Sequence, residues 1–158
     1  MKILLLEDLD TFYEAMLEGL ATRYKEIGKV DIVRIATELE FRNALARLAK
    51  EDFDVAIFDV MVGWCLPEEA VTEAGMNPPL EVAEELSLDK RWRSGVRCRR
   101  MFEESRAQAG ARAVPCLYYS VLDPESLHDE LNDETELVVK QGGIDNLVRA
   151  IKRAAGRK

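Results

Sequence analysis

Three carboxylic acids follow two apolar runs of this chain, at the positions where strands are predicted to end. Glu7 and Asp8 close the run at residues 2–6. Asp59 closes a second run at residues 54–58. Ligands of α/β folds bind outside the carboxyl ends of the strands, so neighbouring strands would bring the three acids into one site. Such acids repel one another unless a cation neutralises them, and oxygen ligands suit Mg²⁺ and its phosphate partners.

Two further polar residues stand at the ends of later predicted strands. Ser120 closes the fourth strand, and Lys140 follows the fifth. A hydroxyl and an ammonium group at this edge could bind phosphate oxygens as negative charge develops on them. Asp59 stands alone at its strand end and is the candidate nucleophile, whereas Glu7 and Asp8 are the candidate metal ligands. The predicted chemistry is nucleophilic catalysis by a carboxylate with metal assistance.

The elements that position these residues alternate between strands and helices. Strands are predicted at residues 2–6, 30–35, 54–58, 114–119 and 136–139. Helices are predicted at residues 11–27, from the cap Thr37 onward, at 96–108, from Asp123 to about 131, and at 144–155. Five strand–helix units with right-handed crossovers indicate an α/β fold with a parallel sheet.

Residues 62–94 interrupt this alternation and fit no strand. A short helix is expected from Pro67 to Gly75, and a second after Pro78 and Pro79. The segment is acidic in its first part and becomes basic at residues 90–93. Loops of this length in compact domains are usually functional or disordered. Its apolar residues suffice for a small docking face, and two alternatives stay open: passive packing over the acidic site, and a partner or homodimer surface.

The composition favours a water-soluble protein of the reducing cytoplasm. The 158 residues form one domain, 1–158, by the length prior, and the net charge of −8 argues against nucleic acid as a partner. No apolar run approaches the roughly 20 residues of a membrane span, and no signal peptide is recognised. Three cysteines without a C-x-x-C pair indicate reduced thiols. The basic residues at 90–100 are expected to pair with the acidic part of the 62–94 segment or to face solvent.

Four short segments at strand ends carry a resemblance to a known family. They are Leu4-Leu5-Leu6-Glu7-Asp8, Ile57-Phe58-Asp59-Val60-Met61, Leu117-Tyr118-Tyr119-Ser120 and Leu137-Val138-Val139-Lys140. In this order the segments resemble the receiver domain of two-component response regulators. The resemblance covers the chain outside residues 62–94. It implies a flavodoxin-like (CheY-like) doubly wound sheet of order 2-1-3-4-5, with an insertion at 62–94 between strand 3 and helix 3.

The resemblance also implies a role for each residue of the site. Asp59 would accept the phosphoryl group and form an acyl phosphate. Mg²⁺ would be bound by three side chains and one backbone carbonyl: Glu7, Asp8, Asp59 and Met61. Ser120 and Lys140 would contact the phosphoryl group and report its presence to the protein surface.

The function that the resemblance implies is phosphorelay signalling by a stand-alone response regulator. The phosphoryl group would come from a sensor histidine kinase or a phosphotransfer protein. The output would be a contact with an unknown downstream protein, since no output domain is seen in this chain. The chain would not be an enzyme, beyond its own phosphorylation and slow dephosphorylation.

Departures from the family pattern motivate a second hypothesis, that of a pseudo-receiver which binds a protein without phosphorylation. The insertion is one departure. Val121 stands where a small residue is common, and Leu137 replaces the aromatic switch residue three positions before the lysine. The presence of every acid, the serine and the lysine argues against this reading.

A third hypothesis is a phosphohydrolase of the haloacid-dehalogenase type, which uses an aspartate nucleophile and a second acid two residues later. The run Asp8-Leu9-Asp10-Thr11 looks similar, but its threonine falls one position early. After Asp59, the place of the second acid is taken by Met61. We therefore favour the receiver reading.

Overall fold

The computed structural model describes residues 1–87, 93–125, 127, 131 and 136–156, and its centre is a five-stranded parallel sheet. The strands are β1 (Lys2–Leu6), β2 (Asp31–Ile35), β3 (Val55–Phe58), β4 (Cys116–Ser120) and β5 (Glu136–Val139). Their order is β2-β1-β3-β4-β5, and all four pairings are parallel. The predicted flavodoxin-like topology is therefore confirmed.

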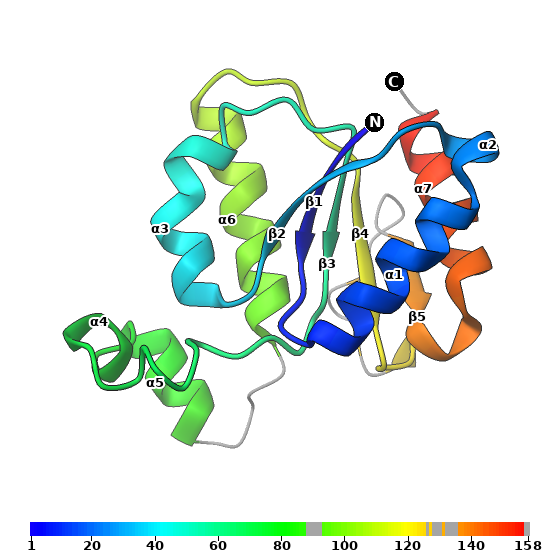
Figure 1. The fold of residues 1–158 in the computed structure, drawn as a ribbon. Helices are drawn as coiled ribbons and strands as arrows, with labels where there is room; N and C mark the ends of the chain where they lie inside the picture. The colour runs from blue at the N-terminus through cyan, green and yellow to red at the C-terminus, as the bar shows by residue number, and fades with distance from the viewer. Residues whose placement is uncertain (88–92, 126, 128–130, 132–135, 157–158) are drawn as a thin grey trace.

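Helices cover both faces of this sheet. They are α1 (Asp10–Thr22), α2 (Tyr24–Ile27), α3 (Glu38–Leu48), α4 (Glu73–Met76), α5 (Leu80–Ser87), α6 (Ser94–Gln108), the 3₁₀ turn η3 (Lys140–Gly142) and α7 (Ile144–Ala155). Figure 1 shows α3 and α6 on one face, and α1 and α7 on the other. Within the described parts of the chain, no helix is both long and apolar enough for a membrane span.

Each face of the sheet has its own hydrophobic core, because side chains alternate along a strand. Leu4, Phe58 and Tyr118 belong to the core beneath α3 and α6. Leu5 and Tyr119 belong to the core beneath α1 and α7. Both faces of β3 are thus buried, which explains why its sequence is continuously apolar.

Strand register aligns the ends of the strands at one edge. Leu6 of β1 lies opposite Phe58 of β3, and the Asp59 N–H donates to the Leu6 carbonyl at 2.9 Å. Ser120 lies opposite Val139, the residue before Lys140. The register therefore brings the predicted functional residues to the same edge.

Two helix predictions were wrong in their extent. The single helix predicted at 11–27 divides into α1 and α2 at Arg23, where the backbone leaves the helical region at φ −100° and ψ 16°. The Thr22 hydroxyl donates to the Gly19 carbonyl at the end of α1, a local bond that competes with the helix. Residues 67–70 form only a turn, and α4 begins after its cap Thr72, whose hydroxyl accepts from the Gly75 N–H.

Two other expectations fall partly outside the described residues. Of the helix predicted from Asp123 to about 131, residues 126 and 128–130 lie there. So do residues 90–92 of the basic cluster. Two described members of that cluster are buried and paired, Arg97 with Glu38 and Arg99 with Glu103. The acids that pair with them belong to α3 and α6 rather than to the 62–94 segment.

The connection between β3 and α6 (residues 59–93) docks on the N-terminus of α3. The Glu38 N–H donates to the Gly63 carbonyl at 3.1 Å, and the Leu39 N–H donates to the Trp64 carbonyl at 2.8 Å. These are among the helix N–H groups that lack an intrahelical partner. Farther along, Glu81 of α5 pairs with Arg42 of α3 at 2.6 Å.

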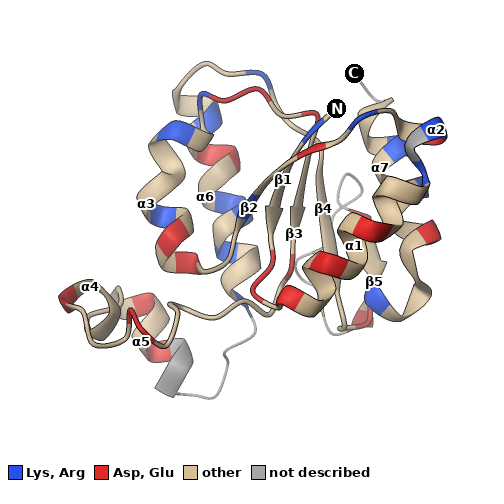
Figure 2. Ribbon diagram, viewed as in Figure 1, with Lys and Arg blue, Asp and Glu red and all other residues tan. Residues whose placement is uncertain are grey.

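The described part of this connection is acidic, and some of its apolar side chains are exposed. Figure 1 shows α4 and α5 projecting from the body beside the edge where β1 and β3 end. In Figure 2 the described parts of these two helices carry acidic positions and no basic ones. Val71, Met76 and Leu80 are exposed, whereas Val82 is buried.

Candidate metal and phosphoryl site

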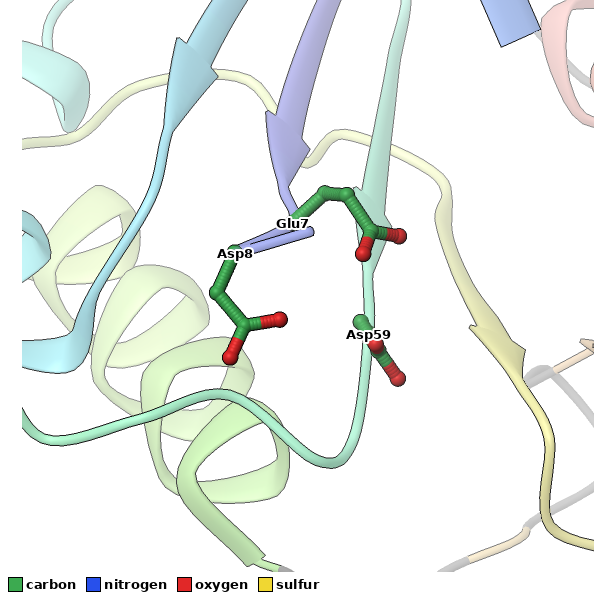
Figure 3. Close-up of side chains that lie close together, drawn as sticks. All are labelled: Glu7, Asp8 and Asp59. Carbon is green, nitrogen blue, oxygen red and sulfur yellow. The ribbon is translucent and has the colours of Figure 1, made fainter. Parts of the chain in front are cut away.

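Glu7, Asp8 and Asp59 form one cluster at the ends of β1 and β3. One carboxylate oxygen from each side chain lies within 4.8 Å of the other two. Figure 3 shows the three carboxyl groups converging from the two strand ends. Glu7 is 1% exposed and Asp59 is 4% exposed, so little water solvates these acids. The proximity predicted from the strand ends is therefore present in the structure.

Lys140 completes the cluster from the end of β5. Its Nζ lies 2.7 Å from Glu7 Oε2 and 2.7 Å from Asp59 Oδ2, and all three side chains are buried. The ammonium also lies over the rings of Phe12, at 4.2 Å, and Tyr119, at 5.4 Å. Such ring faces attract cations, so they help to hold Lys140 against the acids.

The charge and donor types of the cluster fit Mg²⁺. Three carboxylates and one ammonium have a formal net charge of −2, which one Mg²⁺ ion would neutralise. The donors are oxygens, which Mg²⁺ prefers. Because the protein supplies only a few ligands, coordination positions remain for water molecules and a phosphate. We conclude that Glu7, Asp8 and Asp59 fit a Mg²⁺ ion.

Burial perturbs the ionisation of this cluster. Burial raises the pKa of Glu7 above its ordinary value, although bonding to Lys140 opposes the shift. Burial also raises the pKa of Asp8. The hydrogen bond from the Gly63 N–H opposes this shift, and the negative charge of Asp59 adds to it. Burial alone would lower the pKa of Lys140, but the charge and hydrogen bonds of Asp59 and Glu7 outweigh it and leave the pKa raised. Burial therefore disfavours the charged forms of Glu7 and Asp8, and the Lys140 ammonium opposes part of that effect.

Asp8→Asn is expected to stabilise the metal-free protein more at about pH 7 than at about pH 4, near the ordinary pKa of Asp. Folding raises the pKa of Asp8 above the ordinary pKa of aspartate. In the pH range just above that ordinary pKa, the native protein therefore binds more protons than the unfolded protein. Wild-type stability then falls as pH rises through that window, whereas Asn does not titrate. Denaturant unfolding with a chelator at both pH values measures this, and Asp31→Asn, at the exposed start of β2, is the control. A stability difference that is equal at both pH values would contradict the prediction.

Ser120 and Met61 lie at the same edge with other hydrogen-bond partners. Ser120 is fully buried at the end of β4, and its Oγ accepts from the Leu122 N–H at 3.4 Å. The Met61 N–H donates to Asp59 Oδ1 at 3.2 Å and so helps to orient the candidate nucleophile. The implied roles of the Ser120 hydroxyl and the Met61 carbonyl stay predictions.

Sequence reasoning missed two residues that hold the backbone of this site. Arg34 of β2 donates to the carbonyls of Glu7 and Asp8. The only signal in the sequence was a charged residue one position before the end of the strand. Gly95 packs so closely that an added Cβ would lie 1.8 Å from the Asp59 carbonyl oxygen. A glycine in the first turn of a helix was the signal there.

Both ends of the β3–α6 connection are attached to the acidic site. At its beginning, the Gly63 N–H donates to Asp8 Oδ2 at 3.1 Å. At its end, the Gly95 N–H at the start of α6 donates to the Val60 carbonyl at 3.1 Å. The connection therefore leaves and returns at the candidate metal site.

Comparisons with known proteins place this site in a recognised fold. No protein-family model matches the sequence, and a search of curated proteins finds no significant match. A response regulator receiver protein from Sinorhizobium medicae superposes with a TM-score of 0.62 at 13% identity, over 99% of this chain and 94% of that one.

Two further receiver structures are similar. The CheY-like receiver domain from Methylobacillus flagellatus has a TM-score of 0.54 at 14% identity, covering 98% of each chain. The N-terminal domain of a response regulator/sensory box/GGDEF protein from Carboxydothermus hydrogenoformans has a TM-score of 0.52 at 12% identity, over 99% of this chain and 98% of that one. The chain has the CheY-like fold of response regulator receiver domains.

Proposed function

We propose that this chain is a receiver that is phosphorylated on Asp59 and thereby switches a protein contact. The observation that carries the proposal is the buried cluster of Glu7, Asp8, Asp59 and Lys140 at the ends of β1, β3 and β5. Its acids suit Mg²⁺, and its ammonium suits a phosphoryl oxygen. The phosphodonor would be a sensor histidine kinase or a phosphotransfer protein of the cytoplasm.

In the proposed reaction, an oxygen of the Asp59 carboxylate attacks the phosphorus of the donor. An O–P bond forms as the N–P bond to the donor histidine breaks, and the electron pair of that bond leaves with the imidazole. When bound, Mg²⁺ supplies positive charge to the phosphoryl oxygens. Lys140, whose Nζ already lies 2.7 Å from Asp59 Oδ2, would supply a second positive charge.

The product would change the contacts of Lys140 and Ser120. An aspartyl phosphate adds about −1.5 to −2 charges, by analogy with other phosphoresidues. Lys140 now divides its bonds between Glu7 and Asp59, and the phosphoryl oxygens would compete for them. A tenfold population shift needs about 1.4 kcal/mol, which one charge-assisted hydrogen bond supplies. A downstream protein would bind preferentially to the conformation that phosphorylation favours. We propose no turnover of other substrates.

Incubation with acetyl phosphate and Mg²⁺, followed by intact-mass analysis, tests the proposal. We expect one phosphoryl adduct in the wild type and none in Asp59→Asn or with a chelator. Asp31→Asn, which removes an exposed acid at the start of β2, is the matched control and should retain the adduct. The absence of both an adduct and Mg²⁺ binding in the wild type would contradict the proposal and favour the pseudo-receiver reading.

A further inference from the structure

Arg34 connects β2 to the loop that carries the two candidate metal ligands of β1. Its Nε donates to the Glu7 carbonyl at 3.0 Å, and its Nη2 donates to the Asp8 carbonyl at 3.2 Å. Its Nη1 donates to Asp10 Oδ1 at 2.6 Å, in the first turn of α1. All three guanidinium nitrogens thus bind the segment from Glu7 to the first residue of α1, Asp10.

The guanidinium is itself held in place. It lies over the ring of Tyr13, with Cζ 4.4 Å from the ring centroid, and the Arg34 side chain is 20% exposed. Tyr13 belongs to α1, and its N–H donates to the Leu9 carbonyl in the same loop. Arg34 is therefore fixed between the sheet and α1, and it has little freedom to move independently of them.

These contacts constrain the peptide planes from which the metal-binding side chains project. A carbonyl held by a planar, rigid donor fixes the orientation of its peptide group. Here the carbonyls belong to Glu7 and Asp8 themselves, and the Glu7 N–H is also bonded, to the Ile35 carbonyl at 3.0 Å. The backbone of the candidate ligands is thus held from β2 on both sides of Glu7.

We propose that Arg34 is a positioning residue for the metal site, which holds Glu7 and Asp8 in the geometry that binds Mg²⁺. The inference rests on the proposed function. Lysine at this position would keep the charge, but its single ammonium lacks the planar fork that serves two carbonyls and a carboxylate. Groups that orient metal ligands in this way are worth about 10- to 100-fold in metal affinity.

The direction in which Mg²⁺ affinity changes distinguishes a positioning role of Arg34 from a purely electrostatic one. Arg34 is a cation close to the acidic loop, so by Coulomb's law alone its removal would strengthen Mg²⁺ binding. Loss of positioning would weaken Mg²⁺ binding instead. Arg34→Lys sharpens the distinction, because it leaves the charge unchanged and removes only the fork.

Calorimetric titration with Mg²⁺ alone tests the proposal. We expect Arg34→Gln and Arg34→Lys to weaken Mg²⁺ binding about 10- to 100-fold. Arg47→Gln is the matched control, since it removes a 58% exposed cation of α3 that pairs with Glu51. It should bind Mg²⁺ within about twofold of the wild type, because exposed charges are screened. Unchanged or tighter binding by both Arg34 variants would overturn the inference.

Two further measurements keep the result interpretable. Tyr13→Leu removes the stacked ring without changing any charge, and it should weaken Mg²⁺ binding in the same direction by a smaller factor. In acetyl phosphate labelling, saturating Mg²⁺ should restore the rate of the Arg34 variants, which a general loss of structure would not allow. A wild type that binds no Mg²⁺ would overturn the proposed function, whereas wild-type binding with unaffected variants overturns only the role of Arg34.

Discussion

Glu38→Gln is expected to lower the free energy of unfolding by about 3–5 kcal/mol, the usual cost of removing one partner of a buried ion pair. Glu38 is fully buried at the first position of α3, and its Oε2 lies 2.6 Å from Nη2 of Arg97. Arg97 is itself only 6% exposed. The substitution would leave a buried guanidinium beside a neutral amide and remove a negative charge that the helix N-terminus favours.

Chemical denaturation of matched variants measures this effect. Glu26→Gln is the control, because Glu26 is 45% exposed and pairs with Arg23 and Lys152 at the surface. Such exposed pairs contribute about 0–1 kcal/mol, so the control should remain near the wild type. A Glu38→Gln variant within about 1 kcal/mol of the wild type would show that the pair contributes no more than a surface one.

The same substitution should loosen the β3–α6 connection. Glu38 Oε1 also accepts from Arg42 at 2.8 Å, and Arg42 in turn binds Glu81 of α5. Glu38 therefore connects α3, α6 and α5 through two arginines. The stability of the core and the placement of the acidic α4–α5 projection are linked at this residue.

Gly95→Ala is the second change with a large expected effect. Its Cβ would lie 1.8 Å from the Asp59 carbonyl oxygen and 2.7 Å from the Asp59 carbonyl carbon. These are backbone atoms, so α6 or the candidate nucleophile must shift. We expect a loss of about 1–3 kcal/mol of stability, as for other overpacked sites. A displacement of about 1 Å at a reacting group can lower the rate about 100-fold, so labelling by acetyl phosphate should slow accordingly.

Gly63→Ala is the matched control for this change. Gly63 stands at the other end of the connection and also borders the site, but its added Cβ would lie 3.8 Å from its nearest neighbour. That separation is an ordinary contact, and the variant should be within about 0.5 kcal/mol of the wild type. Equal labelling rates in the Gly95→Ala and Gly63→Ala variants would contradict the close packing of α6 on Asp59.

The fold was predictable because long apolar runs identify buried strands and the acids mark their ends. The predicted strand at 136–139 and helix at 144–155 match β5 and α7 in full. Thr37 was predicted to cap α3, and its hydroxyl accepts from the Glu40 N–H at 3.1 Å. The Glu40 carboxylate accepts from the Ala36 N–H rather than from the Thr37 N–H, so the reciprocal bond of a capping box does not form. Local signals thus located elements well and their individual hydrogen bonds less well.

The remaining features of the candidate site depend on tertiary contacts, which no local sequence pattern contains. Nothing near Arg34 in sequence indicates that it reaches the carbonyls after β1, because the two strands pair only in the folded sheet. The same holds for Phe12 of α1, whose ring lies against the Lys140 ammonium from the end of β5. The acidic cluster could be predicted from strand ends alone, whereas the residues that hold it could not.

Chemical location of the phosphoryl group tests the central claim most directly. Borohydride reduces an acyl phosphate to a primary alcohol, so it would convert a phosphorylated aspartate to homoserine. After incubation with acetyl phosphate and Mg²⁺, we predict homoserine at position 59 and at no other position of the digested protein. A phosphorylated protein in which Asp59 is recovered unreduced, with homoserine at another aspartate, would contradict the assignment of Asp59 as the phosphoacceptor.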